Sequence, residues 1–125
     1  MAEESLKAIE DCVGLYFDGL YRSDRALLEK AFHPNASVIG YSSDGKLNLM
    51  ALETFLGFVD TVPSPQDAGS EYDMEILSVD ATPTTASVKV RDLYLGRDFI
   101  DHLHLAREGE TWRIVSKLFH SEKRG

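Results

Sequence analysis

Asp101 is the residue of this sequence whose type and spacing point most directly to chemistry. In the stretch DFIDHLHL it alternates with Leu103 and Leu105, and two histidines take the positions between them. Successive side chains of a strand point to opposite faces, so Asp101 faces the interior if the two leucines do. A carboxylate in an apolar interior is strongly destabilising unless it is paired, hydrogen-bonded or protonated. Asp101 is therefore expected to be either a structural residue with a buried partner or a residue that lines a pocket.

Asp92 and Lys117 are two further ionisable residues whose direction the sequence leaves open. Asp92 alternates with valines in the strand predicted at 86–95, but both faces of that strand are partly apolar. Either the aspartate face or the face with lysine and arginine can therefore point inward. Lys117 lies outside in a regular strand, and a β-bulge between Trp112 and Lys117 would turn it inward. A strand that is partly apolar on both faces also suggests that both faces are buried, one under helices and the other against a second subunit.

The positions of the histidines give little indication of a metal-binding site. His102 and His104 share one strand face and could bind a metal together. Two ligands do not make a site, and this face is opposite to Asp101, toward solvent or a partner subunit. His33 is expected in a turn between a helix and a strand. His120 is either an exposed residue near the carboxyl end or a residue at the rim of a pocket.

Composition limits the kinds of partner. The chain has 125 residues, enough for one domain, with 43% hydrophobic and 27% charged residues. A net charge of -8 argues against binding to nucleic acid or an anionic membrane, because phosphate attraction needs a basic face. Cys12 is the single cysteine, which is compatible with a cytoplasmic location. The acidic, amphipathic N-terminal stretch does not resemble a secretion signal. A small or neutral partner is expected.

Apolar residues at three- and four-residue intervals predict three helices. The first runs from about Ser5 to Tyr21 and carries Tyr16 on its inner stripe, either as a pocket residue or as a core tyrosine bonded to a backbone carbonyl. The second follows the N-cap Asp24, has Phe32 on its buried side and ends at Pro34. The third follows the N-cap Asn48. Its buried face is expected to consist of Leu49, Leu52, Phe55, Leu56 and Val59.

Alternating stretches predict the strands. The expected strands are 36–41 and 46–47 around a turn at 42–45, then 73–78, 86–95 and a hairpin over 98–120. Helices segregated from a mostly antiparallel sheet make this an α+β fold. If the sheet curves strongly around three helices from the N-terminal half, it forms a cone with a pocket at its open end.

The element order and several short stretches together resemble the nuclear transport factor 2-like superfamily. The stretches are YFDGLYRSD, AFHPNASV, FIDHLHL and WRIVSKLFH. Within the superfamily the chain looks like the lumazine-binding branch from near Ser5 to His120. The resemblance implies one domain over residues 1–125 with a cone-shaped, cystatin-like α+β barrel. It leaves the activity open, because this scaffold carries isomerases, dehydratases, polyketide cyclases and non-catalytic carriers.

The ketosteroid isomerases of the superfamily suggest two matching residues and one absence. Ile100-Asp101 and the leucines that follow resemble the second pocket acid of that family. Tyr16 lies eight residues before Asp24, as the pocket tyrosine of the family does. Gly40 stands where the family has its catalytic base. In those enzymes a neutral aspartic acid and a tyrosine donate hydrogen bonds to one oxyanion of the substrate. The resemblance implies this role for Asp101 and Tyr16, but it supplies no catalytic base.

We therefore expect a small-molecule-binding protein, homodimeric through the convex face of its sheet, with a planar or polyketide-like ligand in an apolar cone. Neither a cofactor nor a metal is expected. The predicted pocket residues are Tyr16, Phe32, Val38, Phe55, Asp92, Asp101, Leu103, Trp112, Lys117 and His120. One alternative is a cofactor-independent lyase or isomerase that uses Asp101 and Tyr16, with His120 added in a dehydratase. Another is a structural dimerisation domain with a filled cone. If the protein binds a ligand in this way, Asp101→Asn should weaken binding and leave the melting temperature nearly unchanged, whereas a large loss of stability would favour a structural role of Asp101.

Overall fold

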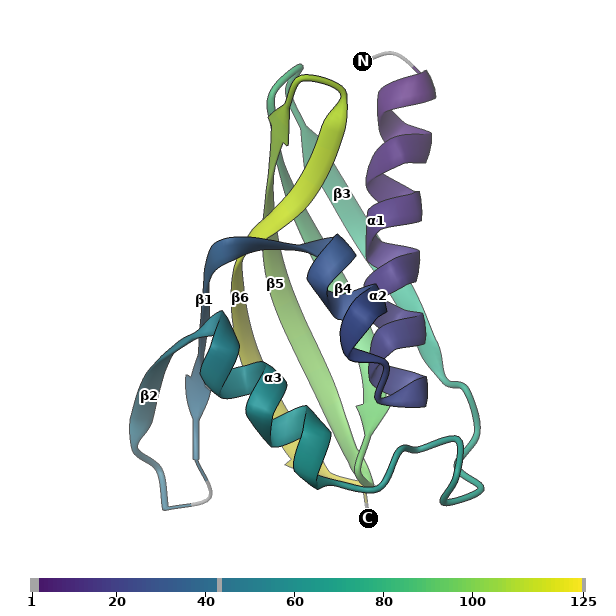
Figure 1. Cartoon of the computed structure of the whole chain (residues 1–125), viewed down its shortest axis with the longest axis vertical. Helices are drawn as coiled ribbons and strands as arrows, with labels where there is room; N and C mark the ends of the chain where they lie inside the picture. Colours follow the sequence, from purple (N-terminus) through teal and green to yellow (C-terminus); the bar gives the residue numbers. More distant parts are fainter. Residues whose placement is uncertain (1–2, 43, 125) are drawn as a thin grey trace.

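The computed structural model describes residues 3–42 and 44–124, which form three helices and six strands (Figure 1). The chain runs in the order α1 (Glu3–Arg22), α2 (Arg25–Ala31), β1 (Phe32–Tyr41), β2 (Leu47–Ala51), α3 (Leu52–Thr61), β3 (Met74–Ala81), β4 (Thr85–Tyr94), β5 (Arg97–Glu108) and β6 (Thr111–Lys123). This order confirms the predicted α+β class.

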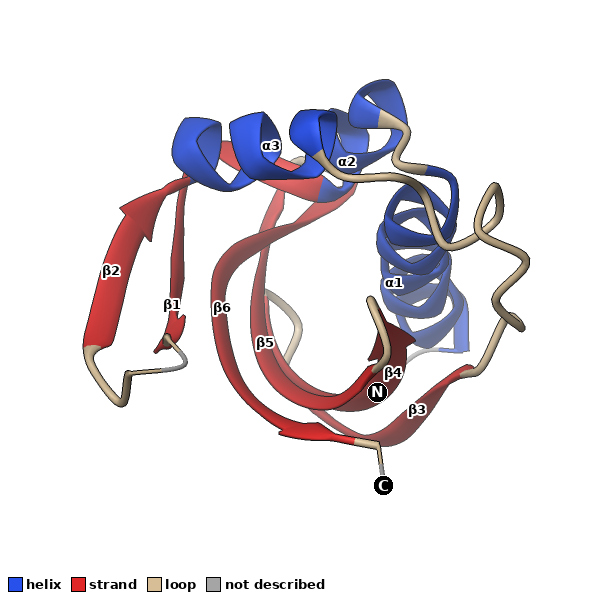
Figure 2. Cartoon of the chain, turned by 90° about the horizontal axis from the view of Figure 1, so that it is seen from below, coloured by secondary structure: helices blue, strands red, loops and turns tan. Residues whose placement is uncertain are grey.

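One curved sheet carries all six strands. Its strand order is β2-β1-β6-β5-β4-β3, and every neighbouring pair is antiparallel except β1 and β6, which are parallel. Figure 2 shows β6, β5, β4 and β3 bent into a wide arc, with the helices on its concave side. The expected cone is therefore confirmed, and its interior lies between the helices and the sheet.

The inner stripe of α1 packs into this interior. Ile9, Val13, Tyr16 and Leu20 recur at helical intervals and are each at most 1% exposed. Burial also raises the pKa of the Cys12 thiol to about 11, so this thiol is inert.

The cytoplasmic location stays a prediction. None of the described helices is long and apolar enough to cross a membrane.

A β-bulge in β6 decides the direction of Lys117. His104 of β5 lies opposite Ser116, whereas the next residue, Leu105, lies opposite Ile114. Val115 is therefore an extra residue in β6. Ile114 is buried before the bulge, and Lys117, which would otherwise face outward, is 4% exposed after it. The alternative with a bulge, left open by the sequence, is the one that occurs.

The third helix begins three residues later than predicted. Residues 47–51 form strand β2, which pairs with β1, and the helix starts at Leu52 after the N-cap Ala51. Leu49 is 73% exposed, so its expected place on the buried helix face is wrong. Asn48 lies opposite Gly40 of β1 and does not cap a helix. Pairing with a neighbouring strand outweighs the local cap signal here.

The second helix ends earlier than predicted, at Ala31. Phe32 is its C-cap and the first residue of β1, so its assignment to the helix is wrong, although it is fully buried. Pro34 lies inside β1, where the pairing with β6 is irregular and a missing N–H is tolerated. The turn predicted at 42–45 includes residue 43, which lies outside the described residues.

Candidate functional site

Three polar side chains meet in the interior, and we call them the Tyr16–Asp101–Lys117 cluster. The Tyr16 hydroxyl donates to Oδ2 of Asp101 at 2.6 Å. Lys117 Nζ in turn donates to the Tyr16 hydroxyl at 2.5 Å and lies 3.9 Å from the same carboxylate oxygen. The cluster is a hydrogen-bonded chain in which the tyrosine links the amine to the carboxylate.

Each member of the cluster comes from a different element. Tyr16 belongs to the inner stripe of α1, and Asp101 lies on β5 between Val90 of β4 and Phe119 of β6. Lys117 is turned inward by the bulge in β6. Tyr16 and Asp101 are 0% exposed and Lys117 is 4% exposed. A buried charge requires a partner, and this arrangement supplies one to both the amine and the carboxylate.

Asp92 of β4 is a second buried carboxyl beside the cluster, and its pKa is raised well above that of an ordinary carboxyl. Burial is the largest cause, and the negative charge of Asp101 is the next. The positive charge of Lys117 acts in the opposite direction without cancelling them. Neither oxygen of Asp92 has a hydrogen-bond partner within the described part of the chain. Asp92 therefore keeps its proton to a higher pH than an exposed aspartate, which reduces the repulsion between the two carboxyls.

The two buried tyrosines remain protonated donors over a wide pH range. Burial, followed by the charges of Asp101 and Asp92, raises the pKa of Tyr16 well above its usual value. Burial, followed by the charge of Asp92, raises the pKa of Tyr94 to about 12. Among described residues the Tyr94 hydroxyl has no hydrogen-bond partner. It is thus a second donor that none of these residues uses.

The amine of Lys117 is surrounded by aromatic rings. Its Nζ lies 4.9 Å from the ring centroids of Tyr16 and Phe55, 5.4 Å from that of Phe119 and 5.8 Å from that of Phe99. A cation within about 6 Å of an aromatic face is attracted by the ring quadrupole. These rings therefore help to hold the amine in place.

A cavity of about 920 Å³ opens from this amine toward the end of the cone. Its inner end is at Lys117, which is buried, whereas Tyr41 and Phe58 are 58% and 49% exposed and mark its mouth. Arg97 brings a second positive charge to the wall and is held by bonds to Ser121. The lining residues are Tyr41, Ser42, Gly45, Asn48, Met50, Thr54, Phe55, Phe58, Tyr94, Arg97, Phe99, Lys117, Phe119, His120 and Ser121.

The predicted site residues fall into three groups. Phe55, Lys117 and His120 line the cavity. Tyr16, Asp92 and Asp101 lie together behind the amine of Lys117 and are not among the lining residues. The remaining four belong to the packed core and not to the cavity wall, namely Phe32, Val38, Leu103 and Trp112.

Several lining residues were not predicted from the sequence. Tyr94, Arg97, Phe99 and Phe119 all contribute to the wall. Arg97 and Phe99 share the alternation of Asp101 in β5, and Phe119 shares that of Lys117 in β6. Extending the alternation of Asp101 toward the start of β5 would have identified Arg97 and Phe99. Phe119 could not be found in this way, because its direction depends on the bulge at Val115.

The histidines other than His120 do not line the cavity. His102 and His104 are exposed on the outer face of β5, and His33 is half-buried near Glu108. Within residues 3–42 and 44–124, no group of three potential metal-binding side chains occurs.

Gly40 leaves room for an aromatic ring and not for a base. It lies opposite Phe119 in the parallel β1–β6 pair, and a Cβ atom at this position would collide with the Phe119 ring. Where ketosteroid isomerases are expected to carry their proton acceptor, this chain therefore has a packed phenylalanine. The ring of Phe119 in turn forms part of the cavity wall.

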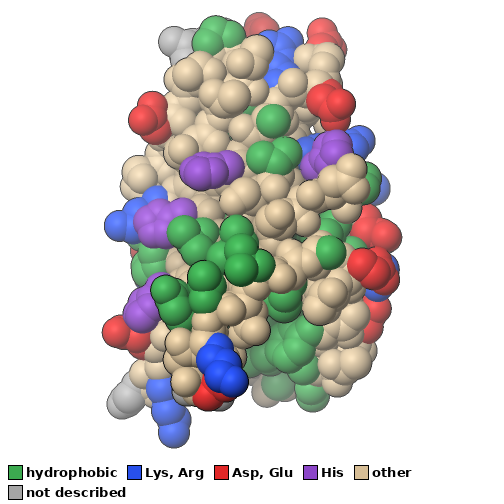
Figure 3. Space-filling model, turned by 90° about the vertical axis from the view of Figure 1, so that its left-hand side faces the viewer, with side chains coloured by type: hydrophobic (Ala, Val, Ile, Leu, Met, Phe, Trp, Pro, Cys, Tyr) green, Lys and Arg blue, Asp and Glu red, His purple; other side chains and the backbone are tan. Residues whose placement is uncertain are grey.

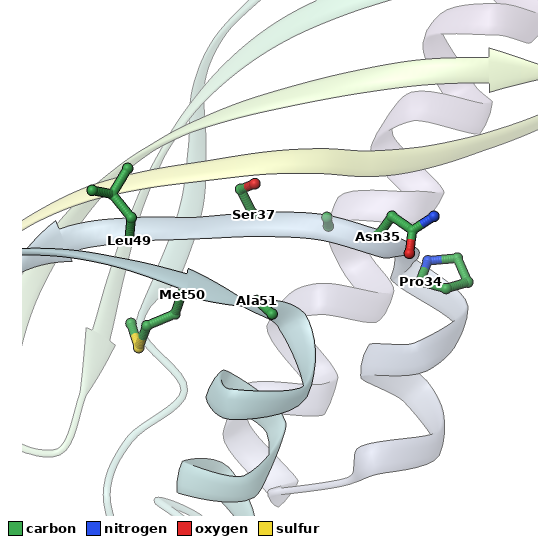
Figure 4. A pocket seen from close by; sticks show the side chains of 7 residues that line it. Pro34, Asn35, Ser37, Leu49, Met50 and Ala51 are labelled. Atoms are coloured by element: carbon green, nitrogen blue, oxygen red, sulfur yellow. The ribbon is translucent and has the colours of Figure 1, made fainter.

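A smaller hollow of about 390 Å³ lies between β1 and β2, around residues 34–37 and 49–51 (Figure 4). Figure 4 shows Leu49 and Met50 pointing to opposite sides of the strand pair. None of the residues that line this hollow is ionisable. It is therefore a weaker candidate than the cavity at Lys117.

The sequence pattern of the family described as "Putative lumazine-binding" matches residues 4–120. The chain belongs to this family. The solved structures include a nuclear transport factor 2-like protein of unknown function from Shewanella baltica, with a TM-score of 0.88 and 25% identity over 99% of this chain and 98% of that one. A similar protein from Silicibacter pomeroyi has a TM-score of 0.81 and 25% identity, covering 98% of this chain and 100% of its own. These likenesses confirm the nuclear transport factor 2-like fold.

One curated relative carries the name of an enzyme. The aldolase FrzH of a Cladobotryum species is 28% identical over 112 residues, which cover 87% of this chain and 85% of that protein. Family membership supports a ligand-binding protein of the nuclear transport factor 2-like fold.

Proposed function

We propose that this protein binds a small, mainly apolar molecule and directs an acceptor oxygen of that molecule toward Lys117. The observation that carries the proposal is the placement of a buried, hydrogen-bonded amine at the inner end of an aromatic cavity. Ligand pockets commonly have volumes of about 300–1,000 Å³ with mostly apolar walls and a few polar groups, and this cavity fits that description. The open cavity supports binding over a filled, purely structural cone.

The positions of the polar groups further define the ligand. An amine at the inner end suits a carbonyl or oxyanion, and the walls of Phe55, Phe99 and Phe119 suit a planar ring. Arg97 suits a polar or negatively charged substituent nearer the mouth. The ligand class is thus a planar molecule with a carbonyl oxygen at one end.

Filling the cavity from α3 should weaken binding strongly. Thr54 lines the cavity and Thr61, on the same helix, does not. We expect 2-acetylnaphthalene or lumazine to bind the wild type in calorimetric titration, and Thr54→Trp to weaken this binding at least about tenfold, or about 1.4 kcal/mol. Thr61→Trp should leave binding unchanged. Equal affinity of both variants, or no binding of either compound to the wild type, would contradict the proposal.

A cofactor-independent lyase is the second candidate. The name of the aldolase relative favours it, as do three ionisable groups gathered at the inner end of the cavity. Asp101 and Tyr16 would then move protons while Lys117 contacts the substrate. A compound recovered chemically altered from the wild type and unaltered from Asp101→Asn would favour this candidate over simple binding.

We also propose a homodimer through the convex face of the sheet. Figure 3 shows hydrophobic side chains gathered on this side of the molecule with histidines beside them. Leu49 and Leu118 are 73% and 43% exposed, and His102 and His104 lie on the neighbouring strand. A second copy of the chain would cover this apolar surface, as large exposed patches commonly are.

Leu118→Glu should therefore convert the dimer to a monomer in light scattering coupled to size exclusion. Leu6→Glu is the control, because Leu6 is similarly exposed at 39% but lies on α1, on the helical side. A wild type that is monomeric, or a dimer that survives Leu118→Glu, would contradict this arrangement.

A further inference from the structure

We infer that Lys117 is a nucleophile that forms an imine with a carbonyl group of the bound molecule. The inference deepens the proposed function, because it requires that a carbonyl compound occupies the cavity. It assigns a covalent role to Lys117 and identifies the substrate class as ketones or aldehydes with a planar, apolar body.

Lys117 differs from every other lysine in the described part of the chain. It is 4% exposed, whereas the other described lysines are all exposed. Its amine lies between Phe55, Phe99 and Phe119, which also line the cavity. A lysine removed from water in an apolar pocket is the usual setting of an amine that forms Schiff bases. The cavity leads a carbonyl carbon to this amine and to no other described lysine.

The contacts of Lys117 are not those of a simple structural ion pair. Its Nζ lies 3.9 Å from Asp101, beyond hydrogen-bond distance, and its single hydrogen bond within the described structure is to the Tyr16 hydroxyl. An ammonium group has three donors, so two remain for groups in the cavity. A lysine held only for stability would be expected to bond the carboxylate directly.

The hydrogen-bonded chain provides the proton transfers that imine formation needs. The ammonium of Lys117 passes one proton through the Tyr16 hydroxyl to the Asp101 carboxylate, which leaves a neutral amine and a carboxylic acid. The nitrogen lone pair then attacks the carbonyl carbon, and the C=O electron pair moves to the oxygen. One proton from the nitrogen and the proton held at Asp101 reach this oxygen. It leaves as water, and the product is an iminium ion with Asp101 ionised again.

An iminium carbon accepts electrons more readily than the carbonyl carbon from which it forms. It therefore serves reactions that make or break a bond at the carbon next to the carbonyl group. The aldolase relative carries the name of such an activity. Tyr16 and Asp101 act in this scheme as proton carriers and Lys117 as the residue that contacts the substrate.

The test uses pentane-2,4-dione, which condenses with a neutral amine to give a stable enaminone that absorbs in the near ultraviolet. We expect the native wild type to gain one adduct, equal in mass to the diketone minus one water. Peptide mapping should place it on Lys117. Lys117→Met, which keeps an apolar side chain of similar length, should form no such adduct. Lys89→Arg, which removes an exposed lysine of β4, should react as the wild type does.

The outcomes separate this inference from the proposed function. Binding of 2-acetylnaphthalene without a diketone adduct would overturn the role of Lys117 and leave the cavity as a binding site. Absence of both binding and adduct would overturn both proposals. If Lys117→Met does not fold, the peptide map of the wild type decides alone. An adduct on Lys117 supports the inference, and adducts confined to exposed lysines overturn it.

Discussion

Asp101→Asn should lower the free energy of unfolding by about 3–5 kcal/mol, the usual effect of breaking a buried charge pair. The substitution removes the carboxylate that accepts from Tyr16 and balances the charge of Lys117, and both partners are buried. The amine would then be left in an aromatic enclosure without a negative partner. Chemical denaturation of the wild type and the variant measures this loss directly.

A double-mutant cycle checks the cause. Lys117→Met removes the charge that Asp101→Asn leaves unbalanced. The double variant should therefore lose less free energy of unfolding than the two single variants lose together. Asp98→Asn is the matched control on the same strand, since Asp98 pairs with Arg124 at the surface and should matter little. Additive effects of the two buried changes, or a stable Asp101→Asn protein, would contradict the coupling.

Asp92→Leu should make the protein more stable, and increasingly so as the pH rises. The pKa of Asp92 is raised in the folded state, so between the unfolded value of about 3.9 and the folded value the native protein binds a proton that the unfolded chain has lost. The stability that Asp92 contributes is complete below the unfolded pKa and is lost as the pH rises through the folded one. Across this window the loss is about 1.4 kcal/mol per pH unit.

Denaturation measured from pH 4 upward would show this as a widening difference between Asp92→Leu and the wild type. The leucine also removes two buried oxygens that lack partners among the described residues. Asp80→Leu, which changes an exposed aspartate of the adjacent strand, is the control for the substitution itself. A constant difference between Asp92→Leu and the wild type at all pH values would show that Asp92 does not retain its proton.

The sequence predicted the fold and the inward direction of Asp101 because alternation and helical spacing are local properties. It could not predict the direction of Lys117, because a bulge depends on how two strands align and has no signature in the residues around Val115. It misplaced residues 48–51 because Asn48 and Leu49 mimic a helix start. Pairing with β1, which only the folded sheet provides, overrode that local preference.

The extent of the cavity also could not be predicted from the sequence. Alternation indicates which side chains face the interior of the cone, but it does not indicate how far each side chain lies from the open end of the cone. Val38, Leu103 and Trp112 do face inward, but at a level where the helices fill the space. On the sequence alone, a large loss of stability in Asp101→Asn would favour a structural role of Asp101 over ligand binding. The contacts of Asp101 with Tyr16 and Lys117 change that expectation, because one carboxylate can serve stability and a ligand together.

The Tyr16–Asp101–Lys117 cluster joins segments that are far apart along the chain. The tyrosine is separated from its two partners by 85 and 101 residues. Contacts of such long range close large loops and are reached slowly in folding. The cluster is thus assembled by the same event that docks the final strand against the opening helix. A folding intermediate without that strand would have three strands of the meander and no complete cluster, so formation of the cluster should lag behind recovery of secondary structure during refolding.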